Sequence, residues 1–112
     1  MTIQANFESY IGEDVSLPVT VYSDSAETTP ANITGWSVQF VVHQVGGSAL
    51  ITQTTSNGGI TLTTPLSGLL TVSIPAALTT NMAAGTYCFR VERTDSGADA
   101  VLTTGTWFLL NK

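Results

Sequence analysis

Apolar and polar residues alternate along most of this chain, which is the pattern of β-strands with one buried face. Residues 15–22 give the clearest example, because every odd position is aliphatic and the even positions are Ser, Pro, Thr and Tyr. Pro18 cannot donate a hydrogen bond to a neighbouring strand, so we expect this strand at an edge of a sheet or at a bulge. Further strands are predicted at residues 2–10, 35–43, 49–55, 60–66, 68–74, 86–94 and 101–110.

Polar and glycine-rich segments separate these strands. The longest, residues 23–34, contains a proline and is predicted to be a surface loop. Residues 75–84 (PAALTTNMAA) are the only plausible helical piece. They are too few for an independently stable helix, so we expect a single helical turn crossing one end of the molecule. Seven or eight strands at about ten-residue spacing predict an all-β, antiparallel sandwich.

The segment Gly85-Thr86-Tyr87 indicates which kind of sandwich this is. It resembles the start of a late strand in immunoglobulin-like domains, where the tyrosine ring covers one end of the core and its hydroxyl hydrogen-bonds to upstream backbone. Trp36, near the start of its strand, fits the core tryptophan of such domains. We therefore predict an immunoglobulin-like antiparallel β-sandwich. Its predicted core aromatic residues are Trp36, Phe40, Tyr87 and Phe89.

Length and composition agree with one domain covering residues 1–112. Only 10% of the residues are charged, while Thr, Ser, Val and Leu are abundant, as in β-rich proteins with a hydroxylic surface. Cys88 is the only cysteine, so no intrachain disulfide can form and the sandwich must be held by packing alone.

Charge and hydropathy limit the partners. A net charge of −5 gives no electrostatic attraction for nucleic acid, so we predict no DNA or RNA binding. No apolar run approaches the about 20 residues needed to cross a bilayer, so no membrane partner is expected. The N-terminal residues lack the basic and apolar regions of a signal peptide, and we expect synthesis in the cytoplasm.

Few residues could carry chemistry. His43 is the only histidine, whereas zinc sites need three or four His or Cys ligands. Asp95, Asp99 and Glu13 could offer oxygen ligands to calcium, although hairpin tips also collect such residues for backbone reasons. No nucleotide-binding or nucleophile motif occurs. We predict that the protein is not an enzyme and has no catalytic residue, cofactor or metal.

The last predicted strand is apolar on both faces near its end, so we expect another protein to cover one side of it. The candidate interface residues are Trp107, Leu109, Tyr10 and Tyr22. Exposed aromatic rings can also stack on sugars. A small carbohydrate-binding module that uses Tyr10, Tyr22 and Trp107 is therefore an alternative.

A series of short motifs adds a family resemblance. The motifs are Leu17–Tyr22 (LPVTVY), Ile33–Trp36 (ITGW), Gly68-Leu69, Gly85–Tyr87 (GTY), Arg93–Gly97 (RTDSG) and Leu102–Gly105 (LTTG). In this order they resemble small phage structural proteins with an immunoglobulin-like sandwich, including the N-terminal domains of phage baseplate upper proteins. The resemblance implies a virion protein without catalytic residues, which forms homo-oligomers or multi-copy assemblies and binds other capsid or tail proteins. Both a tail or baseplate adaptor and a capsid decoration protein fit this description.

Overall fold

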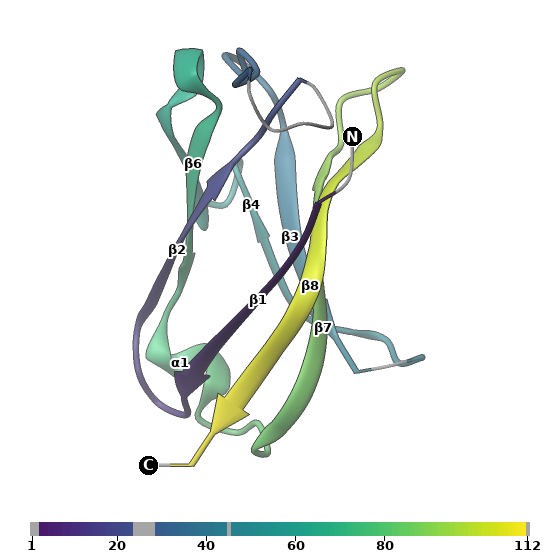
Figure 1. Ribbon diagram of the computed structural model, residues 1–112. Coiled ribbons are helices and arrows are strands. Elements are labelled where there is room, and N and C mark those ends of the chain that lie inside the picture. The colour runs from purple at the N-terminus through teal and green to yellow at the C-terminus, as the bar shows by residue number, and fades with distance from the viewer. Residues whose placement is uncertain (1–2, 24–28, 45, 112) are drawn as a thin grey trace.

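The computed structural model of the chain is a two-layer β-sandwich (Figure 1). It describes residues 3–23, 29–44 and 46–111. Each strand overlaps one of the predicted segments, because alternation of apolar and polar residues is a local property of a half-buried strand. The strands are β1 (Ile3–Tyr10), β2 (Val15–Thr20), β3 (Val38–His43), β4 (Ala49–Thr54), β5 (Ile60–Thr64), β6 (Leu69–Ile74), β7 (Gly85–Arg93) and β8 (Ala100–Leu110).

The two layers have the strand order of an immunoglobulin-like sandwich. One sheet has the order β1-β8-β7-β3-β4, and the other has the order β2-β6-β5. β2-β6-β5 facing β8-β7-β3 corresponds to the two strand sets of that fold. β2 is an outer strand of its sheet, which confirms the edge position predicted from Pro18.

One strand pair departs from the antiparallel prediction. β1 and β8 run parallel, with Tyr10 opposite Leu110 at one end, whereas the other strand pairs are antiparallel. Parallel neighbours need a long connection. The first and last strands of the chain satisfy this requirement because the whole domain lies between them.

The centre of the core is a group of aromatic rings. Trp107 is fully buried, stacks on Phe7 at a centroid distance of 5.4 Å and lies 6.1 Å from Tyr87. Phe89 contacts Phe7 at 5.3 Å and Phe40 at 5.5 Å. These contacts join β1, β3, β7 and β8 into one packed cluster.

Trp36 packs against the core cluster as the sequence predicts, but it is only partly buried and does not fill the centre of the core. β3 begins only at Val38, so Trp36 lies in the segment that leads into the strand and is half-buried. The Arg93 guanidinium covers its ring at 4.1 Å from the centroid, a cation–π contact. Trp107 takes the central position instead, because its ring points inward from a strand that is paired on both sides.

The prediction for the tyrosine of β7 is confirmed. Tyr87 is buried, and its hydroxyl donates a hydrogen bond to the Ala83 carbonyl oxygen at 2.6 Å. Phe89 occupies the position, two residues further on, where antibody domains have a bridging cysteine. Packing of the Phe89 ring thus stands in the place of a disulfide.

A short helical turn closes one end of the sandwich, as predicted. α1 (Ala76–Thr79) follows β6, and the 3-10 helix η1 (Pro65–Ser67) connects β5 to β6. Asp14 accepts a hydrogen bond from the Ala76 N–H at 2.8 Å, and the buried Thr79 hydroxyl accepts one from Gly12 N–H at 2.9 Å. Among the described residues, no helix is long and apolar enough to cross a membrane.

Candidate functional site

An apolar patch lies on the outer face of β1 and β8, near the ends of both strands. The strand register places Phe108 between Glu8 of β1 and Thr86 of β7, and places Leu110 opposite Tyr10. The side chains of Tyr10 and Phe108 are 45% and 40% exposed, and Leu110 is half-buried. We call Tyr10, Phe108 and Leu110 the β1–β8 patch.

The patch follows from how residues 107–110 are divided between the two faces of β8. All four are apolar, so only one alternate pair can enter the core. Trp107 takes the inward phase because it stacks on Phe7 and its indole N–H donates to the Ser9 hydroxyl at 2.8 Å. Leu109 shares that phase, and Phe108 is left outside.

This division corrects two of the predicted interface residues. Trp107 and Leu109 are both buried and cannot contact a partner. The two-sided apolarity of residues 107–110 predicts an exposed apolar side chain on this strand, but the exposed phase is that of Phe108 and not that of Trp107 and Leu109. Phe108, which lies between the two predicted residues, is the exposed aromatic side chain of this strand.

Tyr10 and Tyr22 lie at opposite ends of the sandwich. Tyr10 ends β1, whereas Tyr22 follows β2, which runs back along the length of the molecule (Figure 1). Tyr22 is half-buried and pairs with Pro30 through an isolated bridge. The three-residue aromatic platform of the carbohydrate hypothesis is therefore not formed, because Tyr10 is the one member of the three that is exposed.

Two shallow cavities lie near this end of the molecule. One of about 200 Å³ is lined by Asn6, Phe7, Glu8 and Phe108 along the β1 side of the patch. The other, of about 230 Å³, lies at the end of the β2–β6 pair. Both are smaller than the about 300 Å³ at which pockets for drug-sized ligands begin. The first lies beside the patch, and its lining includes one carboxylate, that of Glu8.

The strand register also pairs His43 with Cys88 across β3 and β7. Both side chains are half-buried on the outer face, and the His43 Nδ1 hydrogen-bonds with the Gln44 carbonyl oxygen at 2.8 Å. Sequence analysis treated these two residues separately because they are far apart in the chain. In the described part of the chain, no group of three His, Cys, Asp or Glu residues could hold a metal ion.

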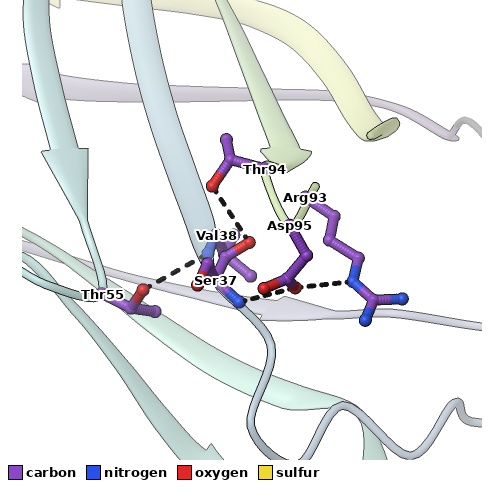
Figure 2. A network of polar contacts seen from close by, with 6 residues as sticks. All are labelled: Ser37, Val38, Thr55, Arg93, Thr94 and Asp95. Carbon is purple, nitrogen blue, oxygen red and sulfur yellow. Dashed lines mark hydrogen bonds and ion pairs between the residues drawn. The ribbon is translucent and has the colours of Figure 1, made fainter. Parts of the chain in front are cut away.

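The carboxylate of Asp95, a candidate calcium ligand, is bound by neighbouring groups of the protein (Figure 2). Its Oδ2 accepts hydrogen bonds from Arg93 Nε at 2.8 Å and from the Ser37 N–H at 2.9 Å. The hydrogen bond from Arg93 and the one from Ser37 hold the pKa of Asp95 below its ordinary value of 3.8. Thr94 N–H also donates to the Ser37 carbonyl oxygen. These hydrogen bonds connect the segment that precedes β3 to the end of β7.

The other two candidate calcium ligands do not form a site with Asp95. Glu13 follows β1 and its N–H donates to the Tyr10 carbonyl oxygen, so it lies at the opposite end of the sandwich from the β7–β8 hairpin (Figure 1). Asp99 is exposed in that hairpin.

Charge is distributed unevenly along the chain. Residues 28–89 contain no Asp, Glu, Lys or Arg. β3, β4, β5 and β6 lie within this stretch, so none of these four strands carries an Asp, Glu, Lys or Arg side chain. The carboxylates of Glu8, Glu13 and Asp14 lie on or beside β1 and β2. Among the described residues, the carboxylates therefore lie on or beside β1, β2, β7 and β8, and none lies on β3, β4, β5 or β6. In comparisons with known proteins, no family model and no curated protein sequence matches this chain.

Proposed function

We propose that this protein is a non-enzymatic structural component of a bacteriophage virion, which acts by protein–protein assembly as a tail or baseplate adaptor or as a capsid decoration protein. The observation that carries the proposal is the β1–β8 patch, in which two aromatic rings stand half-exposed on an open sheet face. Aromatic residues are enriched at the centres of protein interfaces, where polar residues surround them. The motif order that resembles phage structural proteins supplies the biological setting.

The patch is large enough to matter energetically. Aromatic side chains have about 150–250 Å² of surface each, so covering the exposed parts of Tyr10 and Phe108 removes on the order of 150 Å² from water. At about 25 cal/mol per Å², this corresponds to about 4 kcal/mol before the costs of association. A contribution of this size is characteristic of an interface hot spot.

Mass spectrometry of purified virions tests the proposal, with the chain expected among the abundant structural proteins. A Tyr10→Ser/Phe108→Ser double variant should fold but be depleted from particles by at least tenfold. Leu66→Ser is the matched control, because Leu66 is apolar and 73% exposed but lies in η1, outside the patch. Absence of the wild-type chain from particles, or equal incorporation of both variants, would contradict the proposal.

A carbohydrate-binding module is a second candidate, favoured by one observation. Tyr10 and Phe108 are exposed on neighbouring strands, and the cavity beside Phe108 contains Asn6 and Glu8, which could hydrogen-bond sugar hydroxyls. Titration calorimetry against a panel of cell-surface glycans distinguishes the two candidates. Binding that Phe108→Ser abolishes would support this function, and no heat change across the panel would remove it. Tryptophan fluorescence is unsuitable because Trp107 is buried.

A further inference from the structure

β4 is an edge strand that differs from the other edge strands of the sandwich. β4 is the last strand of the five-stranded sheet, so within the described chain no strand lies on one side of its backbone. Such an edge presents unpaired N–H and C=O groups that can pair with another chain. Natural proteins usually block these edges with charges, prolines or short strands.

The other three sheet edges are blocked in these ways. β2 contains the exposed Pro18, and β1 presents the exposed carboxylate of Glu8. β5 has five residues, its ladder is irregular between Thr61 and Thr64, and Pro65 follows it directly. β4, with the sequence ALITQT, has neither a charge nor a proline.

The hydrogen bonds around β4 locate the centre of its open edge. Thr55 N–H donates to the Val38 carbonyl oxygen of β3 at 3.0 Å. Antiparallel ladders alternate, so the backbone groups of Thr54 and Thr52 point away from β3. Thr54 N–H is already bonded to Asn57 Oδ1 at 3.0 Å. Thr52 is therefore the residue whose N–H and C=O are both offered to a new strand.

The other end of β4 limits the edge in the same way. The register shifts at Leu50, which opposes no residue of β3 and forms a bulge. Leu50 is 52% exposed there. A partner strand can therefore follow only a short stretch centred on Thr52, with Leu50 beside it as an apolar contact.

The charge distribution is compatible with a second copy as the partner. Two copies that each carry a net charge of −5 repel one another wherever their carboxylates approach. The β4 edge lies in the uncharged stretch of residues 28–89, so two copies can meet there without that repulsion.

We infer that β4 pairs antiparallel with β4 of a second copy around a twofold axis at Thr52. Each Thr52 N–H then donates to the Thr52 carbonyl oxygen of the other copy, and the two five-stranded sheets become continuous. This dimer would be the form in which the protein enters a virion. Its presence in a virion rests on the proposed function, whereas the pairing of two copies does not. It leaves the β1–β8 patch, on the strands at the other end of the sheet order, free for a different virion protein.

Sedimentation equilibrium over a range of protein concentrations tests the dimer. Thr52→Pro removes the outward N–H without removing a bond to β3, so it should raise the dimer dissociation constant by at least tenfold while the circular dichroism spectrum stays unchanged. Thr52→Lys places like charges opposite each other and should act similarly. Ser16→Lys, at an exposed position on the edge of the other sheet, is the control and should not change the constant.

Cross-linking tests the register. In a Cys88→Ser background, Thr52→Cys places two Cα atoms about 5.5 Å apart across the axis, within the range of disulfides. This variant should oxidise to a covalent dimer, whereas Thr61→Cys on β5 should not. A wild-type chain that stays monomeric at all concentrations, or a dimer that Thr52→Pro does not weaken, would overturn the inference. A monomer found in virions refutes only the dimer, and an edge-dependent dimer absent from virions refutes only the proposed function.

Discussion

Replacing Trp107 with alanine tests the phase of β8, on which the position of the candidate surface depends. Trp107 is fully buried between Phe7 and Tyr87, so its removal leaves a large cavity in the core. Such truncations cost about 3–5 kcal/mol. Because a domain of this size has a free energy of unfolding of about 5–15 kcal/mol, the variant should lose a large part of its stability.

The matched variant is Phe108→Ala, one residue along the same strand on the opposite face. Phe108 is half-exposed, so its truncation should cost about 1 kcal/mol or less. Ser9→Ala gives an intermediate loss of about 1–3 kcal/mol, because it leaves the buried Trp107 N–H without its acceptor. The three free-energy losses therefore distinguish the buried face of β8, which Trp107 occupies, from the exposed face, which Phe108 occupies.

Urea denaturation followed by far-ultraviolet circular dichroism measures all three variants, since Trp107→Ala removes a fluorophore. With an m-value of about 2 kcal/mol per molar urea, the midpoint should fall by about 2 M for Trp107→Ala and by about 0.5 M or less for Phe108→Ala. If Phe108→Ala were as destabilising as Trp107→Ala, the assignment of Phe108 to the surface would be wrong, and the β1–β8 patch would lose its main residue.

Three further predictions concern the framework. Tyr87→Phe removes the hydrogen bond to the Ala83 carbonyl oxygen and should lower the free energy of unfolding by about 1 kcal/mol in urea titrations; no change would mean that this bond contributes nothing. The lowered pKa of Asp95 stabilises the fold fully above its unfolded value of 3.8, and this contribution is lost as the pH falls through the lower folded pKa. Asp95→Asn should therefore flatten the dependence of stability on pH below about 4, and an unchanged acid limb would contradict this assignment. Gly68→Ala should cost at least about 2 kcal/mol, because φ is +72° and the new Cβ would lie 2.3 Å from a backbone carbonyl oxygen. Gly12→Ala, with a φ of +80° and no atom within 4 Å, should cost clearly less when both variants are compared by urea denaturation.

The sequence was sufficient for the strands, the closing helical turn and the tyrosine of β7. Each of these depends on a local pattern. Alternation shows that a segment has one apolar face, a short apolar segment after Pro75 can form only one helical turn, and Gly-x-Tyr marks the start of a particular strand. Pro18 likewise indicated an edge strand because the missing N–H is a property of the residue itself.

Three features were decided only by the tertiary structure. The direction of β1 relative to β8 is not contained in either strand's pattern, because alternation is the same in parallel and antiparallel pairs. The pairing of His43 with Cys88 across the sheet depends on the register of β3 and β7. The choice of Trp107 over Trp36 for the core depends on rings that arrive from β1 and β7.

The candidate surface shows the same limit most clearly. Residues 107–110 are all apolar, so the sequence indicated that one face of β8 would be left outside but not which one. The stacking of Trp107 on Phe7 and its hydrogen bond to Ser9 decide this, and both partners lie on β1, about a hundred residues away in the chain. Local patterns report which residues prefer to be buried, whereas the burial of one face in preference to the other is a free-energy difference between whole packed arrangements.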